Sequence, residues 1–243
     1  IDAIFNGFTE LHGDRCFGDD AAIVGGLAWF GKIPVSVIGH QKGKDTNQNI
    51  QRNFGMPHPE GYRKACRLMK QAEKFKRPLI CFIDTPGAYP GAQAEERGQA
   101  WSIAQTLAEM SSLRTPTISV VIGEGCSGGA LALGVADRVL MLSYATYSVI
   151  SPHGCASILW NDLSRTEEMA ENLKMTAPDL LKLGIIDEII PEPLEGAHRE
   201  STEAFELVRG KIDQSLQTLM KRDLDMLVEE RYQRLKRIGV YSS

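Results

Sequence analysis

The chain has 243 residues, which is enough for one large domain or two small ones. With 43% hydrophobic and 24% charged residues it has the composition of a soluble globular protein. The net charge of -4 gives no reason to expect nucleic acid or an anionic membrane as a partner. No apolar run approaches the ~18 residues of a membrane-spanning helix.

The cysteines and histidines argue against a metal site on this chain. The cysteines number five, an odd count, and no C-x-x-C pair is present. A disulfide framework or a cysteine zinc site is therefore not expected. We expect a reducing, cytoplasmic setting instead. The five histidines are scattered without H-E-x-x-H spacing, so we predict no metal here.

The periodicity of the sequence predicts alternating strands and helices. In the first half we expect a helix over residues 2–11, strands over 22–30 and 33–40, a polar loop over 41–59, a helix over 60–75, a strand over 79–83, a Pro/Gly loop over 84–91 and a helix over 93–113. In the second half we expect strands over 118–122, 138–142, 147–151 and 185–190, and helices over 154–160, 166–175, 178–183 and 202–238. Such alternation predicts an α/β fold. The short, irregularly spaced strands favour a spiral of β-β-α units over a doubly wound sheet.

A glycine-rich stretch at residues 123–129 is where we expect the chemistry. It joins the buried strand to a helix of small residues, so free N–H groups of the first helical turn point at whatever binds there. Three interpretations compete. A dinucleotide fingerprint requires an acid about 20 residues on, and that place holds Leu142, Ser143 and Tyr144.

The other two interpretations stay open. Gly125-Cys-Ser-Gly-Gly129 fits the nucleophile elbow of an α/β-hydrolase-type serine esterase, with Ser127 as nucleophile. Asp162, Asp179 or Asp187, with His198, would complete such a triad. Alternatively, the backbone N–H groups of Gly128 and Gly129 form an oxyanion hole without any side-chain nucleophile.

Basic residues suggest a second kind of contact. Lys42 and Lys44 lie in the polar loop, and Arg63 lies on a basic face of the helix that follows. These side chains are candidates for phosphate or partner contacts, and the alternative is an ordinary solvated face.

An ordered set of motifs spans nearly the whole chain. The motifs are Phe17-Gly-Asp-Asp20, Gly39-His-Gln-Lys-Gly43, Arg52-Asn-Phe-Gly-Met-Pro-His-Pro-Glu-Gly-Tyr-Arg-Lys64, Asp84-Thr-Pro-Gly-Ala-Tyr-Pro-Gly91, Ala94-Glu-Glu-Arg-Gly98, Gly128-Gly-Ala-Leu-Ala-Leu-Gly134, Tyr147-Ser-Val-Ile-Ser-Pro152, Pro191-Glu-Pro-Leu194 and Gly196-Ala-His198. Together they closely resemble the carboxyltransferase alpha subunit of bacterial acetyl-CoA carboxylase.

The resemblance implies a fold and a reaction. The implied fold is the crotonase (ClpP-like) spiral, with residues 1–200 as the carboxyltransferase domain, residues 201–243 as its C-terminal helical arm, and the family's N-terminal helical segment missing. The implied reaction moves a carboxyl group from carboxybiotin to acetyl-CoA, giving malonyl-CoA for fatty acid biosynthesis.

The resemblance also implies partners and site residues. Biotin is carried on a separate biotin carboxyl carrier protein, zinc is expected only on a beta subunit, and the assembly is an alpha2-beta2 unit coupled to biotin carboxylase. By position, Gly128 and Gly129 form the oxyanion hole for biotin, and Gly87, Ala88 and Tyr89 line the same pocket. This chain departs from the family pattern at Cys126, where glycine is usual, and at His153, where glutamate is usual.

Overall fold

The computed structural model describes residues 1–194, 196–197, 199 and 201–239. Within these residues the strands form one eight-stranded sheet in the order β1-β2-β3-β4-β5-β6-β8, and β7 pairs with the end of β5. The strands are β1 (Asn6–Glu10), β2 (Ile23–Phe30), β3 (Ile33–His40), β4 (Leu79–Thr85), β5 (Thr117–Cys126), β6 (Arg138–Leu142), β7 (Thr146–Ser148) and β8 (Glu188–Ile190). The β1–β2 and β2–β3 pairs are antiparallel, and every later pair is parallel. The carboxyl ends of β3, β4 and β5 therefore meet at one edge of the sheet.

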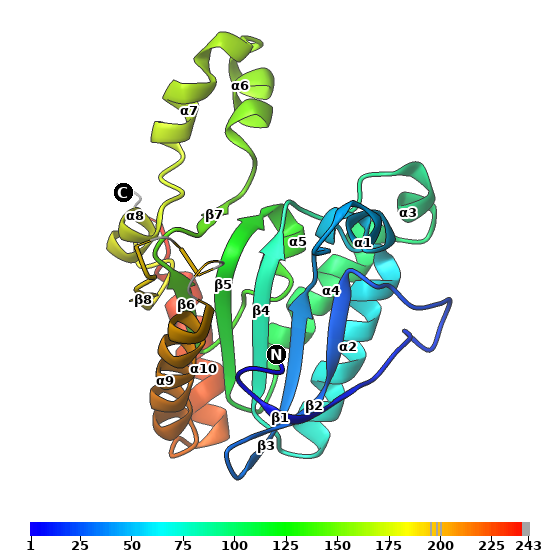
Figure 1. Ribbon diagram of the computed structural model, residues 1–243, viewed down its shortest axis with the longest axis vertical. Helices are drawn as coiled ribbons and strands as arrows, with labels where there is room; N and C mark the ends of the chain where they lie inside the picture. The colour runs from blue at the N-terminus through cyan, green and yellow to red at the C-terminus, as the bar shows by residue number, and fades with distance from the viewer. Residues whose placement is uncertain (195, 198, 200, 240–243) are drawn as a thin grey trace.

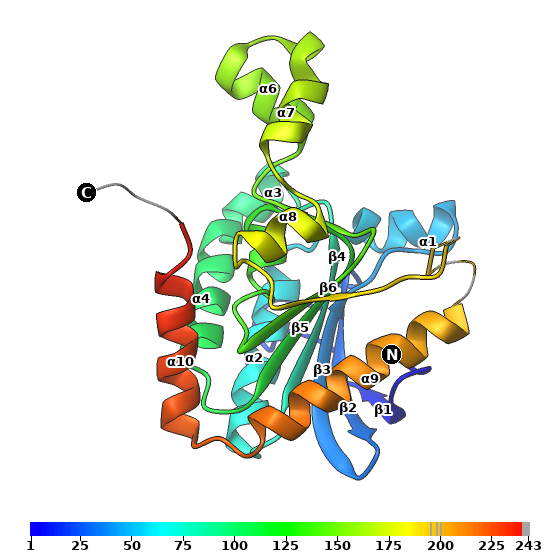
Figure 2. The ribbon, with the colours of Figure 1, turned by 90° about the vertical axis from the view of Figure 1, so that its left-hand side faces the viewer.

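Helices cover both faces of this sheet. They are α1 (Thr46–Gln51), α2 (Pro59–Lys74), α3 (Ala92–Glu96), α4 (Gln99–Ser112), α5 (Ser127–Leu131), α6 (Pro152–Trp160), α7 (Thr166–Asn172), α8 (Ala177–Lys182), α9 (Ser201–Leu219) and α10 (Leu224–Lys236), with 3-10 turns η1 (Asn53–Gly55) and η2 (Leu163–Arg165). In Figures 1 and 2, α2 and α4 pack on one face and α9 on the other, while α10 lies beside α4. None of the described helices is long and apolar enough to traverse a bilayer.

The core explains why β4 and β5 read as continuous apolar runs. The side chains of Leu79 to Ile83 are all buried, because helices cover the strand on both faces.

The α/β prediction is confirmed. Most predicted strands and helices form within a few residues of their expected bounds, including the hairpin at Gly31, whose φ of +60° suits the first position of a type II′ turn.

The expected helix over residues 2–11 is wrong, because half of that segment, Asn6–Glu10, forms β1. Asn6 pairs with Trp29, and Thr9 pairs with Leu27. Gly26 makes this pairing possible, since a Cβ there would lie 2.1 Å from the Thr9 carbonyl oxygen. A short, weakly periodic segment takes its structure from the strand beside it rather than from its own propensity.

Two long predicted helices are interrupted, and the long polar loop is partly ordered. The helix expected over 93–113 divides at Gly98, whose φ of +82° a regular helix cannot hold. The helix expected over 202–238 divides before α10, where the Asp223 side chain caps the new helix by accepting from the N–H groups of Asp225 and Met226. The loop expected over 41–59 contains the short helix α1.

A helical hairpin stands away from the body of the molecule. Helices α6 and α7 project beyond the sheet edge in Figures 1 and 2. Their own small core consists of Cys155, Ala156 and Met169. Outside that core, Ile158 is 73% exposed and Leu159 is 65% exposed. The hairpin thus presents apolar side chains with no cover from the rest of the described chain.

Candidate active site

The glycine stretch lies where the sequence predicts it, between β5 and α5. Helix α5 begins at Ser127, directly after the strand, so no carbonyl four residues earlier is available to the N–H groups of its first turn. Ser127 has a φ of +61°, which an L residue adopts only under strain and which gives the sharp strand-to-helix turn. The turn aims the start of α5 at the carboxyl edge of the sheet.

A pocket opens at this turn. It has a volume of about 420 Å³, and its walls include Ser127, Gly128, Leu131, Tyr147, Val149 and Ile238. Burial raises the pKa of Tyr147 to about 12 although Arg234 opposes the shift, so the phenol stays neutral at physiological pH. The pocket is mostly apolar, and the start of α5 supplies its polar corner.

Gly129 is buried, is not part of the lining of this pocket, and touches the loop after β4. A Cβ on Gly129 would lie 2.5 Å from the Ala88 nitrogen and 2.8 Å from the Gly87 carbonyl carbon. A Cβ on Gly128 would meet only the Ile103 side chain, at 3.5 Å. Glycine at 129 is therefore needed for close approach of α5 to the loop. The structure brings Gly128, Gly129, Gly87 and Ala88 together, although the roles given to them and to Tyr89 stay predictions.

Tyr89 is held by the segment that precedes α2. Its N–H donates to the Pro57 carbonyl at 3.0 Å. Its ring stacks on the His58 imidazole, with the ring centres 4.4 Å apart and the planes inclined by 36°. Sequence reasoning did not single out Pro57 or His58 individually, because their contacts to the loop depend on tertiary structure.

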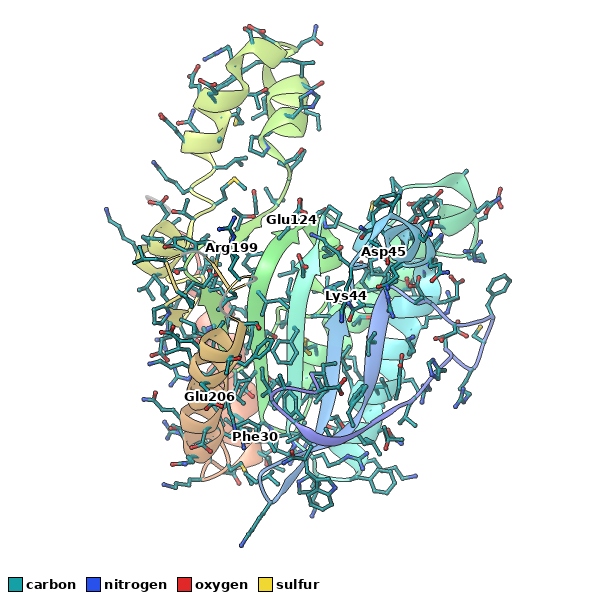
Figure 3. The ribbon with its side chains drawn as sticks, viewed as in Figure 1. Phe30, Lys44, Asp45, Glu124, Arg199 and Glu206 are labelled. Atoms are coloured by element: carbon teal, nitrogen blue, oxygen red, sulfur yellow. The ribbon has the colours of Figure 1, made fainter. Side chains whose placement is uncertain are left out.

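Charged side chains cluster at the same edge of the sheet. Lys42 Nζ lies 2.8 Å from Asp84 Oδ1 and 3.2 Å from Glu124 Oε2. Burial opposes the charge of Lys42, but these two carboxylates raise its pKa above the ordinary value. Figure 3 places Glu124 and Lys44 at this edge, with Lys44 beside α1.

The three basic residues differ in their surroundings. Lys42 is paired as described, and Lys44 is exposed. Arg63 pairs with Asp14 at 2.8 Å and with Glu60 at 2.9 Å. Arg63 therefore ties α2 to the chain before it, and any phosphate or partner contact of these residues remains a prediction.

The hydrolase triad finds no support in the described structure. Ser127 is exposed, but the acids proposed for it are engaged elsewhere: Asp162 accepts from Ser164, Asp179 from Thr176, and Asp187 from the Val139 N–H. His198 lies outside the described residues. The described residues also contain no group of three or more His, Cys, Asp or Glu side chains placed to hold a metal ion.

Comparison with known proteins decides between the remaining interpretations. Residues 1–239 match the family described as acetyl co-enzyme A carboxylase carboxyltransferase-like. The chain belongs to this family. It is 60% identical over 239 residues to the acetyl-coenzyme A carboxylase carboxyl transferase subunit alpha of Shouchella clausii (strain KSM-K16), covering 98% of this chain and 74% of the relative. It is also 60% identical to the subunit alpha of Listeria monocytogenes serotype 4b (strain CLIP80459), covering 100% of this chain and 76% of the relative.

Solved structures agree on the fold of this carboxyltransferase family member. A chain of a Pseudomonas malonate decarboxylase hetero-tetramer in complex with coenzyme A superposes with a TM-score of 0.73 at 19% identity, covering 91% of this chain and 88% of that one. A transcarboxylase 12S chain superposes with a TM-score of 0.68 at 23% identity, covering 83% of this chain and 36% of that one. These neighbours have the crotonase fold, which confirms the predicted fold class, and the family membership does not favour the serine esterase.

Proposed function

We propose that this chain is the alpha subunit of the acetyl-CoA carboxylase carboxyltransferase and that, with a beta subunit, it transfers a carboxyl group from carboxybiotin to acetyl-CoA. The observation that carries the proposal is the 60% identity to alpha subunits over the whole chain. The product is malonyl-CoA, which supplies fatty acid biosynthesis. The choice of acyl-CoA depends largely on the beta subunit, which completes the site.

The residues present suit a biotin ring. The pocket of about 420 Å³ is mostly apolar, and Ser127 and Gly128 at the start of α5 lie at its polar end. The Ala88 nitrogen lies next to Gly129 of the same helix. When bound, carboxybiotin supplies the carboxyl group. The N–H groups of Gly128 and Gly129 are fixed donors for an oxygen that becomes negatively charged, and removing one such donor typically costs ~2.7–4 kcal/mol of transition-state stabilisation. The apolar walls limit water at the reacting group.

The assembly is part of the proposal. We infer an alpha2-beta2 unit that works with the biotin carboxyl carrier protein and biotin carboxylase, with zinc on the beta subunit. The exposed Ile158 and Leu159 on the α6–α7 hairpin support a protein partner, because solvent-exposed apolar side chains that gather on one element mark interaction sites. The five cysteines are all free thiols, which supports a reducing, cytoplasmic setting.

The test is synthesis of malonyl-CoA by the purified chain. The assay contains acetyl-CoA and carrier protein charged by biotin carboxylase, with or without the beta subunit. We expect product only when the beta subunit is present, and we expect Ser127→Ala to keep the rate within about threefold, since the hydroxyl is not a nucleophile in this mechanism. Steady turnover by the chain alone, or labelling of Ser127 by a fluorophosphonate with ester hydrolysis, would defeat the proposal.

A further inference from the structure

Gln99 joins the two segments that meet behind the candidate active site. It is the first residue of α4 and is only 3% exposed. Its side-chain Nε2 donates to the Pro57 carbonyl at 2.8 Å and to the Tyr89 carbonyl at 2.9 Å. An amide nitrogen carries two hydrogens, so both are used to connect residues 55–58 with the loop over 85–89.

Other hydrogen bonds join the same two segments. The Thr85 hydroxyl lies 2.7 Å from the Gly55 carbonyl oxygen and accepts from the Gly87 N–H at 3.1 Å. The Tyr89 N–H donates to the Pro57 carbonyl, which thus accepts twice. The loop that carries Ala88 is consequently held at both of its ends by residues 55–58.

The two ends of the Gln99 amide have different surroundings. Its Oε1 atom is buried and has no hydrogen-bond partner within the described part of the chain. A buried acceptor without a partner lowers stability. The contribution of this side chain therefore lies in its two donors and in what they hold.

We propose that Gln99 is a positioning residue for carboxyl transfer, which fixes the loop over 85–89 so that Ala88 stays against Gly129. The inference rests on the proposed function, because it assigns the loop to that reaction. The contact is close enough to matter, since the Ala88 nitrogen lies 2.5 Å from the position of a Gly129 Cβ. A displacement of about 1 Å at a catalytic donor can reduce the rate about 100-fold.

The experiment compares three variants in the chain assembled with its beta subunit. Gln99→Glu places acceptors where the donors were, Gln99→Met keeps the length without any donor, and Gln105→Glu is the control on the exposed side of the same helix. We expect both Gln99 variants to reduce kcat about 10- to 100-fold with KM within about twofold, because only geometry at the reacting group changes. Amide hydrogen exchange of residues 85–91 should become at least about tenfold faster in both, and Gln105→Glu should match the wild type.

Two results would overturn the role proposed for Gln99. Wild-type kcat in both Gln99 variants, or reduced kcat with unchanged exchange of residues 85–91, would overturn it. If Gln99→Glu does not fold, Gln99→Met decides alone. If the wild-type assembly makes no malonyl-CoA, the proposed function fails, whereas the exchange measurement still reports whether Gln99 holds the loop.

Discussion

Gly128 and Gly129 are adjacent, yet their surroundings predict different responses to substitution. A Cβ at 129 would lie 2.5 Å from the Ala88 nitrogen and 2.7 Å from the Tyr62 hydroxyl oxygen, whereas a Cβ at 128 has room. We expect Gly129→Ala to lower the free energy of unfolding by about 1–3 kcal/mol, the usual range for an overpacked site. Gly128→Ala should change it by no more than about 0.5 kcal/mol. Urea denaturation of both variants measures this, and equal losses would contradict the close contact of Gly129 with Ala88.

His40 predicts a specific loss of stability in mild acid. The His40 side chain is buried. Burial lowers its pKa to about 4, although the charge of Asp84 opposes the shift. The unfolded chain, with an ordinary pKa near 6.5, then binds more protons than the folded chain as the pH falls. Full stability is present above about pH 6.5, and it declines as the pH falls toward 4.

The measurement is the free energy of unfolding at pH 8 and pH 5. Titration of His40 should cost the wild type about 2 kcal/mol over this interval, and His40→Gln should be spared that loss. The exposed His153→Gln is the control for removing an imidazole elsewhere. Equal losses in wild type and His40→Gln would exclude His40 as the cause.

At the scale of elements, the local sequence pattern predicts a strand or helix correctly where contacts with neighbouring elements do not change its structure. The apolar run of β4 and the hairpin at Gly31 carry their own signals, and both form as expected. The segment that becomes β1 carries no strong signal, because its structure depends on pairing with β2. The break at Gly98 could have been expected from glycine within a helical pattern, but its left-handed φ comes from the fold.

Helix α10 is fastened to the body by a buried ion pair that sequence reasoning did not find. Arg231 Nε and Nη2 bind the two oxygens of Asp137 at 2.8 and 2.9 Å. Nη1 donates to the carbonyls of Met110 and Leu113 at 2.8 and 2.9 Å. The partners are 94 or more positions away in sequence, so no local pattern reveals them.

Replacing this arginine should be far costlier than replacing a surface one. Arg231→Met leaves the Asp137 charge buried and unpaired, which typically costs 3–5 kcal/mol. Arg222→Met removes a pair with Glu230 whose side chains are about half exposed, and should cost at most about 1 kcal/mol. Guanidinium denaturation of the two variants tests this, and similar losses would show that the buried pair does not fasten α10.

For the whole molecule, the sequence predicts the glycine turn at the centre of the candidate site better than it predicts the roles of the charged residues around it. The glycines of residues 123–129 predict a tight strand-to-helix turn, and the structure has this turn between β5 and α5. The basic residues carry no such geometric signal: Arg63 binds Asp14 and Glu60 within the chain. Whether a charged side chain serves the fold or a ligand depends on which acids the fold brings beside it.

The α6–α7 hairpin gives the last prediction, which concerns assembly. Ile158 and Leu159 are mostly exposed, so Ile158→Ser with Leu159→Ser should leave the unfolding free energy of the isolated chain within about 0.5 kcal/mol. If the beta subunit covers them, each contributes roughly 1.5–3 kcal/mol on burial. The double variant should then bind the beta subunit at least about 100-fold more weakly.

Sedimentation of the chain mixed with the beta subunit measures this affinity. Met226→Ser, which changes an apolar side chain that is 54% exposed on α10, is the matched control. Amide exchange offers a second measurement, because the hairpin has a small core of its own, separate from the main core of the described residues, and should exchange rapidly until the partner covers it. An unchanged affinity, together with rapid exchange of residues 150–175 in the assembled complex, would remove the hairpin from the interface and require another surface for the beta subunit.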